Sequence, residues 1–338
     1  MNKNTILVTG AGGFVGFATV KKLLSSGHRV RALELPASPY VEALKLLAQQ
    51  HSDLTLHTAN ICNSQELELV LQGVTHVIHS AALLNSIAPK STFEAVNVLG
   101  AKNVIEAAKQ ANVERFLLVS TSDVFGIPRP GEIISETTPY RSWGEPYADT
   151  KIAACELLKS ACANHDMEFS IIYPGWVYGP GDKQFFPAII DMLRDKDVFL
   201  WHRDKPYAID FIFIEDLVNA ITNAIFNPAA RNEDFLILND EANMTPQAIF
   251  SWMADHLNLP IRVHKLPYGL MMLIARVSQW LCQKGVTKSH LLSTTDVKAF
   301  GNDFNFSAAK ARKLLGWNNQ TPELDGFEQF FEWYQSNQ

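Results

Sequence analysis

Tyr147 and Lys151 stand four residues apart, and their types and spacing suggest catalysis. In a helix, this spacing puts both side chains on one face. A nearby ammonium favours the phenolate and lowers the pKa of a tyrosine toward neutral pH. Such a phenol can exchange a proton with a substrate hydroxyl or carbonyl while a hydride moves to or from a nicotinamide. Tyrosine and lysine also meet at this spacing by chance, so the pair needs support from other residues.

A run of hydroxyl side chains, Ser120-Thr121-Ser122, follows an apolar stretch that predicts a strand over residues 116–120. A hydroxyl at the carboxyl end of a strand can donate a hydrogen bond to a reacting oxygen and orient it. The alternative is a polar strand end or a helix cap. The run therefore supplies a candidate third member for the tyrosine and lysine pair.

Three glycines near the N-terminus predict the site for the cofactor that such chemistry needs. Gly10, Gly13 and Gly16 follow the apolar run Thr5–Thr9 and lead into a helical pattern. The first glycine permits a tight turn, the second leaves room for a pyrophosphate, and the third lets the helix approach the sheet. The N–H groups at the start of that helix then face the phosphates. Close packing without any ligand would also explain glycines here.

The composition is that of a globular protein. The chain has 338 residues, of which 47% are hydrophobic and 19% charged, and its net charge is −6. This charge gives no basic surface for nucleic acid. The four cysteines form no metal-ligand spacing, so we expect reduced thiols, no metal and a cytoplasmic protein. No apolar run reaches the ~18 residues of a membrane span, and no leader peptide is expected.

Strand and helix patterns alternate from residue 5 to residue 174. Strands are predicted at 5–9, 29–34, 54–59, 75–80, 116–120 and 169–173, with helices at 14–26, 40–50, 65–71, 93–111 and 147–164. This order predicts an α/β fold with a doubly wound parallel Rossmann sheet. We expect a dinucleotide-binding domain over 1–174 and a smaller, mostly helical substrate lobe over 175–338. Segments near 207–240 are expected to return to the sheet.

Several motifs in order resemble the extended short-chain dehydrogenases/reductases, the family of NAD-dependent epimerases, dehydratases and 3β-hydroxysteroid dehydrogenase-like enzymes. The resemblance runs nearly end to end. It rests on residues 9–16 (TGAGGFVG), 79–82 (HSAA), 97–100 (NVLG), 120–126 (STSDVFG), 146–151 (PYADTK), 173–182 (YPGWVYGPGD), 210–216 (DFIFIED) and 310–317 (KARKLLGW).

The resemblance implies catalytic roles. Tyr147 would be the acid/base, and Lys151 would tune it and hold the nicotinamide ribose. Thr121 matches the catalytic hydroxyl position, with Ser122 as second choice. Asp123 matches an acid of the dehydratases, but Ser122 stands where those enzymes have their other acid. The residues implied for cofactor binding are Gly10, Gly13, Phe14, Val15, Gly16, Glu34, Asn60, Ile61, Ala81, Ala82, Asn97, Tyr147, Lys151, Pro174 and Val177.

Glu34 predicts the choice of cofactor. A carboxylate at the end of the second strand accepts hydrogen bonds from the adenosine ribose and repels a 2′-phosphate. Leu35 rather than an arginine follows it, which favours NAD over NADP. Arg29 and Arg31 weaken this preference slightly. Asn60 stands where the family usually has an aspartate that contacts adenine.

The substrate region lacks two arginines that nucleotide-sugar enzymes of the family often carry. Ile209 and Tyr173 occupy those positions. The stretch 185–190, with Phe185 near the expected pocket, is apolar, as is 266–282, and both resemble the sterol-dehydrogenase-like branch, as does 291–306. Packed helices would explain such runs equally well. A weak membrane-surface role for residues 266–282 is a further hypothesis.

We therefore expect an NAD-dependent oxidoreductase that interconverts a secondary alcohol and a ketone on a mainly apolar, steroid- or lipid-like small molecule, with Asp123, Phe185 and Ile209 near the substrate. One alternative is a nucleotide-sugar 4-epimerase with tightly bound NAD. Another is a non-catalytic NAD sensor. The helices at 93–111 and 147–164 predict a homodimer, as in the family's common pairing, although packing on the sheet also explains their apolar positions.

Overall fold

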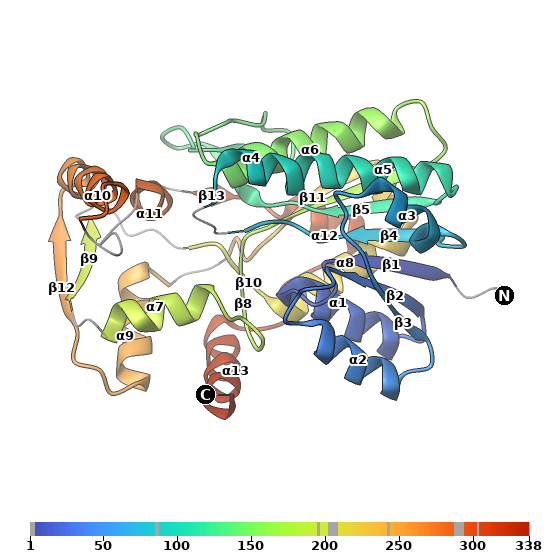
Figure 1. The fold of residues 1–338 in the computed structure, drawn as a ribbon. Helices are drawn as coiled ribbons and strands as arrows, with labels where there is room; N and C mark the ends of the chain where they lie inside the picture. Colours follow the sequence, from blue (N-terminus) through green and yellow to red (C-terminus); the bar gives the residue numbers. More distant parts are fainter. Residues whose placement is uncertain are drawn as a thin grey trace.

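Seven parallel strands form one central sheet in the computed structural model of the chain (Figure 1), which describes residues 4–84, 88–194, 197–201, 209–241, 244–286, 294–302 and 304–337. The sheet order is β11-β7-β5-β4-β1-β2-β3. These strands are β1 (Thr5–Thr9), β2 (Arg29–Glu34), β3 (Leu54–Thr58), β4 (His76–His79), β5 (Arg115–Val119), β7 (Glu168–Pro174) and β11 (Glu233–Ile237). The order reverses at β1, so the doubly wound parallel sheet is confirmed.

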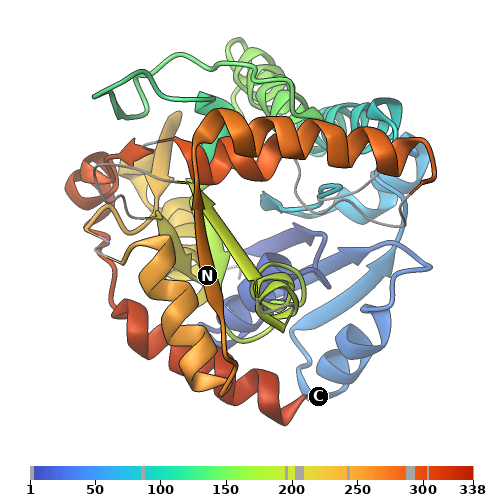
Figure 2. The same ribbon diagram turned by 90° about the vertical axis from the view of Figure 1, so that its left-hand side faces the viewer.

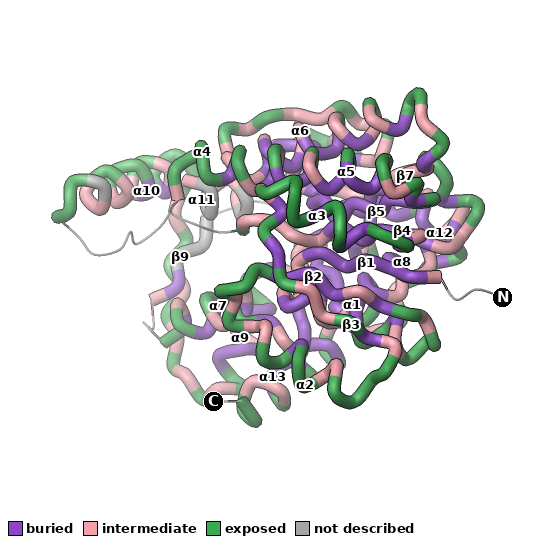
Figure 3. The backbone as a smooth tube through the Cα atoms, turned by 45° about the vertical axis from the view of Figure 1, so that its right-hand side comes forward, coloured by how far each residue is buried: buried purple, intermediate pink, exposed green. Residues whose placement is uncertain are grey.

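Helices cover both faces of this sheet (Figure 1). One face carries α1 (Phe14–Ser25), α2 (Val41–Gln50) and α8 (Ile214–Phe226); the other carries α3 (Ser64–Leu71), α5 (Ala101–Gln110) and α6 (Pro146–Cys162). The central strands β1, β4 and β5 are buried along their whole length, as parallel strands covered on both faces must be. Figure 3 shows this burial as a continuous core through the sheet.

The predicted helix at 93–111 is interrupted in the structure. It consists of α4 (Lys90–Phe93), a π-helical turn η1 (Glu94–Gly100) and α5. Gly100 lies where a Cβ would stand 2.7 Å from the Ile61 side chain, so the absent side chain permits close packing. The wide turn changes the direction of the side chains beyond it, and sequence periodicity does not reveal such a turn.

A seventh strand, β11, extends the sheet beyond the six predicted strands. It pairs in parallel with β7, with Phe235 opposite Ile172. Because β11 falls within residues 207–240, part of that segment does lie in the central sheet. The division of the chain into domains at residue 174 stays a prediction, as does the homodimer.

The remaining C-terminal elements build a second group beside the carboxyl edge of the sheet (Figure 2). Its helices are α7 (Phe185–Arg194), α9 (Pro246–His256), α10 (Tyr268–Gln283), α11 (Thr294–Gly301) and α13 (Glu323–Ser336). Helix α12 (Ala309–Leu315) instead packs against β11 and α8 of the central fold. Small two-stranded sheets join β8 (Trp176–Tyr178) to β10 (Phe211–Phe213), β9 (Asp197–Trp201) to β12 (Arg262–Leu266), and β6 (Ile133–Ile134) to β13 (Asn305–Phe306). The short 3₁₀ turns are η2 (Ser122–Phe125) and η3 (Pro228–Ala230).

A second hydrophobic core joins α7, α9 and α13 to β8, β10 and α8, with Phe186, Phe211, Phe327 and Phe330 among its buried residues. Helices α10 and α11 share a separate small cluster. The apolar stretch 185–190 thus largely consists of packed helix, as its alternative interpretation proposed. Residues 291–293 of the apolar stretch 291–306 lie outside the described part of the chain. Among the described residues, none of the helices combines the length and apolar character that crossing a bilayer requires.

Gly16 offers a test of the packing between the first turn and the sheet. A Cβ at this position would stand 2.1 Å from the Gly10 carbonyl oxygen, whereas a Cβ at Gly269 meets nothing within 4 Å. We expect Gly16→Ala to lower the free energy of unfolding by about 1–3 kcal/mol, because backbone must move. Gly269→Ala, the control, should leave it unchanged or raise it by up to about 1 kcal/mol. Equal urea midpoints for both variants would contradict this interpretation.

Candidate functional site

Lys151 connects helix α6 to the carboxyl end of strand β5. Its side chain is buried, and Nζ donates a hydrogen bond to the Val119 carbonyl oxygen at 2.6 Å. Burial lowers the pKa of the Lys151 ammonium to about 8. The group therefore remains mostly charged at neutral pH, and it lies at the sheet edge where ligands of open parallel sheets bind.

Tyr147 lies one turn before Lys151 in α6, and its side chain is half-buried. Burial raises the pKa of its phenol, and the neighbouring Asp123 carboxylate raises it further. The direction is opposite to the lowering that the spacing of tyrosine and lysine predicts. Burial and the negative charge nearby set this direction, and the phenol is neutral at physiological pH.

Asp123 comes from the 3₁₀ turn η2, which follows β5 and packs against α6. Burial raises the pKa of its carboxyl to about 6, a hydrogen bond with Thr121 opposes this, and Glu145 adds to it. A carboxyl with this pKa changes its charge close to neutral pH, beside the phenol of Tyr147. The structure therefore brings Asp123, Thr121 and Tyr147 to one place.

The hydroxyl run provides the helix cap that is one of the two roles the sequence allows. Thr121 caps η2, because its Oγ1 accepts a hydrogen bond from the Asp123 N–H at 3.2 Å, and its side chain is buried. Ser122 is buried as well, while Ser120 Oγ lies 3.1 Å from Cys155 Sγ. Thr121 as the catalytic hydroxyl, with Ser122 as second choice, stays a prediction.

The glycine turn has the shape that a dinucleotide requires. Gly10 has φ +63°, and a Cβ there would stand 2.7 Å from Ala81 Cα. Gly13 begins α1 without any side-chain cap, so the first helical N–H groups remain available to an anion. The Phe14 ring packs against Gly181, and Val15 packs on the core, so these two residues would offer backbone rather than side chains.

Glu34 is hydrogen-bonded to this turn. Its carboxylate accepts hydrogen bonds from the Gly12 N–H at 2.8 Å and the Leu35 N–H at 3.0 Å. Arg31 points elsewhere, because its guanidinium donates to the carbonyl oxygens of Val70 and Gln72 at the end of α3. Arg31 is therefore already occupied, and the carboxylate beside the glycine turn fits an adenosine ribose without a 2′-phosphate.

The other residues expected to line the cofactor lie on neighbouring strand ends. Asn60 is exposed and accepts the Cys62 N–H, whereas the Ile61 side chain is buried in the core. Ala81 and Ala82 follow β4, and the Ala81 N–H donates to Thr9 Oγ1. These positions surround the same edge of the sheet as the glycine turn.

Asn97, in the π-helical turn, connects two segments of the chain through side-chain hydrogen bonds. Its Oδ1 accepts the Leu83 N–H at 2.7 Å, and its Nδ2 donates to the Leu83 carbonyl and to Thr150 Oγ1, both at 3.1 Å. Thr150 precedes Lys151 in α6. Asn97 thus ties the chain after β4 to the helix that carries Tyr147, and its direct contact with a cofactor stays a prediction.

Pro174 and Val177, which are expected near the cofactor, lie at the end of β7 and in β8, and their contact with a cofactor stays a prediction. Two of the expected substrate residues, Phe185 and Ile209, are apolar and packed. Phe185 is half-buried, its ring 4.8 Å from that of Trp176, and Ile209 is buried in the second core. The expected place of Phe185 and Ile209 near a substrate stays a prediction.

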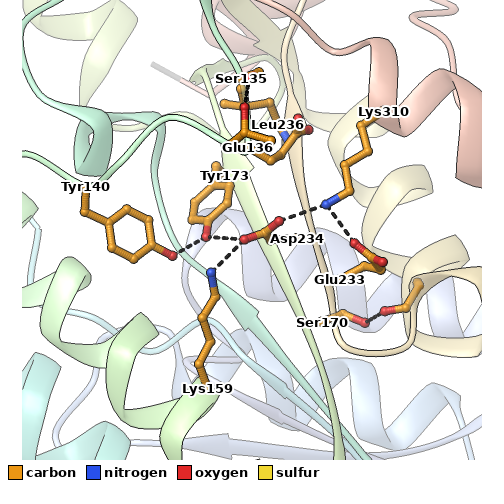
Figure 4. A network of polar contacts seen from close by, with 12 residues as sticks. Ser135, Glu136, Tyr140, Lys159, Ser170, Tyr173, Glu233, Asp234, Leu236 and Lys310 are labelled. Carbon is orange, nitrogen blue, oxygen red and sulfur yellow. Dashed lines mark hydrogen bonds and ion pairs between the residues drawn. The ribbon is translucent and has the colours of Figure 1, made fainter.

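Tyr173 lies in a polar network on the β11 side of the sheet (Figure 4). Its hydroxyl contacts that of Tyr140 and donates to Asp234 Oδ2. Lys159 and Lys310 donate to the same carboxylate, and although burial opposes them, they hold the pKa of Asp234 below its usual value. Tyr173 thus serves the packing of β7, α6 and α12 (Figure 4), a role that sequence spacing does not suggest.

One contact near the site could not be predicted from the sequence pattern. Lys298 of α11 donates to the Trp143 carbonyl oxygen at 3.1 Å and lies 3.9 Å from Glu145 Oε1. Glu145 immediately precedes α6. The distant helix α11 therefore contacts the segment from which the helix of Tyr147 starts.

Asp123 predicts a dependence of stability on pH. Because the folded state binds its proton more tightly than the unfolded state, stability falls as pH rises from the ordinary carboxyl value to about 6. Asp123→Asn cannot ionise, so we expect its free energy of unfolding to exceed that of wild type by about 3 kcal/mol at about pH 8, and by little at about pH 4. Urea unfolding at several pH values measures this.

The exposed Asp255 provides the control substitution, Asp255→Asn. A difference between Asp123→Asn and wild type that stays constant with pH would refute the assignment of a raised pKa to Asp123. The same would hold if Asp255→Asn reproduced the pH-dependent difference.

Comparisons with known proteins agree with this geometry. The model of the NAD dependent epimerase/dehydratase family matches residues 6–237. A 3-beta-hydroxysteroid dehydrogenase of Mycolicibacterium neoaurum is 27% identical over 333 residues, covering 92% of this chain and 86% of the relative. A decarboxylating sterol-4-alpha-carboxylate 3-dehydrogenase of Mus musculus is 26% identical, covering 92% and 85%.

Solved structures show the same fold. The UDP-glucose 4-epimerase of Thermotoga maritima aligns with a TM-score of 0.78 at 20% identity, covering 98% of this chain and 99% of that one. MoeE5 in complex with UDP-glucuronic acid and NAD aligns with a TM-score of 0.75 at 23% identity, covering 99% and 100%. With the glycine turn, the helix of Tyr147 and Lys151 and the family match together, the chain belongs to the NAD-dependent epimerase/dehydratase family of extended short-chain dehydrogenases/reductases, and it is an enzyme with NAD as cofactor.

Proposed function

We propose that this protein is a dehydrogenase that interconverts a secondary alcohol and a ketone on a mainly apolar, steroid- or lipid-like molecule. The observation that carries the proposal is the apolar character of the chain around β8. Trp176 and Phe185 are partly buried there against the second core, to which Ile209 belongs. Ile209 occupies a position where nucleotide-sugar enzymes of the family often have an arginine. Apolar side chains favour a substrate with little charge, because buried diphosphate would lack cationic partners.

Each residue of the site has a role in this proposal. The bound cofactor supplies the hydride acceptor or donor. In alcohol oxidation, the Tyr147 phenol first loses its proton to solvent, and the phenolate then takes the hydroxyl proton as the carbinol carbon gives up its hydride to the cofactor. In ketone reduction, the neutral phenol gives its proton to the new alkoxide oxygen. Thr121 donates a hydrogen bond to the reacting oxygen, and Lys151 supplies a positive charge that favours the phenolate.

The glycine turn and Glu34 hold the other end of the dinucleotide in this proposal. The N–H groups at the start of α1 would bind the pyrophosphate, and Glu34 would accept hydrogen bonds from the ribose. Sterol dehydrogenases among the similar proteins support the substrate class. The 4-epimerase among the solved structures shares the fold alone, at 20% identity.

The substitution Tyr147→Phe tests the proposed catalysis. We expect the rate of NADH formation with a 3β-hydroxysteroid to fall by about 10²–10⁴-fold, because the proton acceptor is lost. NAD affinity should change by less than about threefold, since the ring remains. Tyr334→Phe, in α13, is the matched control and should keep full activity.

The same assay distinguishes the alternatives. Interconversion of UDP-sugars without net NADH, and no turnover of hydroxysteroids, would show a 4-epimerase instead. Unchanged turnover in Tyr147→Phe would exclude the phenol as acid/base. Binding of NAD by the wild type without turnover of either substrate class would favour the non-catalytic sensor.

Glu34→Gln tests the preference for NAD. The amide can still accept the Gly12 N–H, but it no longer repels a 2′-phosphate. We expect the ratio of NADP to NAD affinity to rise by about tenfold or more, measured by titrating both dinucleotides. A ratio equal to that of wild type would show that Glu34 does not face the ribose.

A further inference from the structure

Helix α10 turns an apolar face toward solvent. Leu270, Leu273, Val277 and Trp280 are 43%, 58%, 49% and 56% exposed. Their spacing of three, four and three residues puts them on one side of the helix. Figure 3 shows the exposed positions along α10, which projects from the body of the molecule. Single exposed apolar residues are common, but a continuous stripe marks an interaction surface.

The opposite side of α10 packs against α11. Met271 and Ala275 are buried against Val297 of α11. Gly301 of α11 lies close to Tyr268, since a Cβ there would stand 2.5 Å from the Tyr268 ring. The stripe is therefore additional to the face that holds the helix in the fold, and it stays exposed in the part of the chain that the structure describes.

The charge around α10 differs from that of the chain as a whole. Residues 256–295 contain no aspartate or glutamate, whereas the whole chain has 35 acidic residues and a net charge of −6. The same segment carries five cations: Arg262, Lys265, Arg276, Lys284 and Lys288. Arg276 and Lys284 are exposed, and Lys284 follows Trp280 by one turn. An apolar stripe edged by cations, with tryptophan near one end, suits an anionic lipid surface.

A second copy of the chain fits this face less well. Symmetric pairing of two α10 helices would bring Arg276 and Lys284 of both copies to one interface. Because residues 256–295 lack carboxylates, that interface would gain like charges without acidic partners from this segment. Phosphate headgroups supply the missing negative charge.

We propose that the stripe of α10 (Leu270, Leu273, Val277 and Trp280) binds the surface of a bilayer that contains anionic lipids. The helix lies in the plane of the membrane, as a 16-residue helix of about 24 Å can. The four apolar side chains enter the boundary between headgroups and acyl chains. Arg276 and Lys284 extend their stems and leave their charges among the phosphates.

This placement bears on the candidate active site. Helix α10 packs on α11, and Lys298 of α11 contacts Trp143 and Glu145 just before the helix of Tyr147. Figures 1 and 2 show α10 in the C-terminal group at the carboxyl side of the sheet. Membrane docking would hold that side near the bilayer, where apolar molecules dissolve. This last step rests on the proposed function, whereas the docking itself does not.

Vesicle sedimentation of the full chain, without substrate, tests the docking. We expect binding to vesicles of phosphatidylcholine and phosphatidylserine, weaker binding to phosphatidylcholine alone, and loss of the difference in high salt. Leu273→Gln with Val277→Gln should lower the partition coefficient by about tenfold or more, because two apolar side chains no longer enter the boundary. NAD binding should be unchanged.

The matched control replaces exposed leucines outside α10, Leu46→Gln with Leu69→Gln, and should bind vesicles like wild type. Absence of wild-type binding to anionic vesicles would overturn the proposal, and so would equal binding by the α10 variant. A wild-type dimer in analytical ultracentrifugation that the α10 variant abolishes, without vesicle binding, would identify a second copy as the occupant. Failure of hydroxysteroid turnover would leave the docking result standing and reject only the proposed function.

Discussion

The buried ammonium of Lys151 is the constraint on which the candidate site depends. A charge taken out of water is costly unless its protons find acceptors, and here Nζ donates to the Val119 carbonyl at 2.6 Å. That bond fixes α6 against the carboxyl end of β5. Tyr147, one turn earlier, is held at the same edge, and η2 brings Asp123 to it from the end of the same strand. One hydrogen bond thus positions α6, the helix of Tyr147 and Lys151, relative to the central sheet.

Much of this arrangement could be predicted because its signals are local. Buried parallel strands are short continuous apolar runs, and β1, β2, β4 and β5 lie within about one residue of their predicted bounds. Gly10 and Gly16 predicted a tight turn and a close approach, and both are found, with backbone atoms where their side chains would stand. To predict that Tyr147 and Lys151 lie on one face of a helix required only helical periodicity.

Features that depend on distant contacts gave no such signal. The acidic pair at the start of β11 looks like a polar loop in sequence, but Lys159 and Lys310, both more than seventy residues away, neutralise Asp234 and permit its burial. The π-helical turn before α5 ends at Gly100, which approaches the distant Ile61 side chain so closely that a Cβ would stand 2.7 Å from it. The helical pattern at 266–282 was visible, but which of its two apolar faces is covered depends on α11.

Electrostatics also determines whether the Tyr147 phenol is neutral or ionised before a reaction. Burial, and then the Asp123 carboxylate, keep the phenol neutral. In the proposed function, Tyr147 therefore rests as a proton donor suited to a carbonyl substrate. Oxidation of an alcohol would need the phenolate first, which the proposed role of Lys151 favours and the Asp123 charge opposes. With a pKa of about 6, Asp123 is mostly ionised at neutral pH. The two directions of the reaction therefore place opposite demands on one carboxyl, and its protonation becomes a determinant of which direction the site favours.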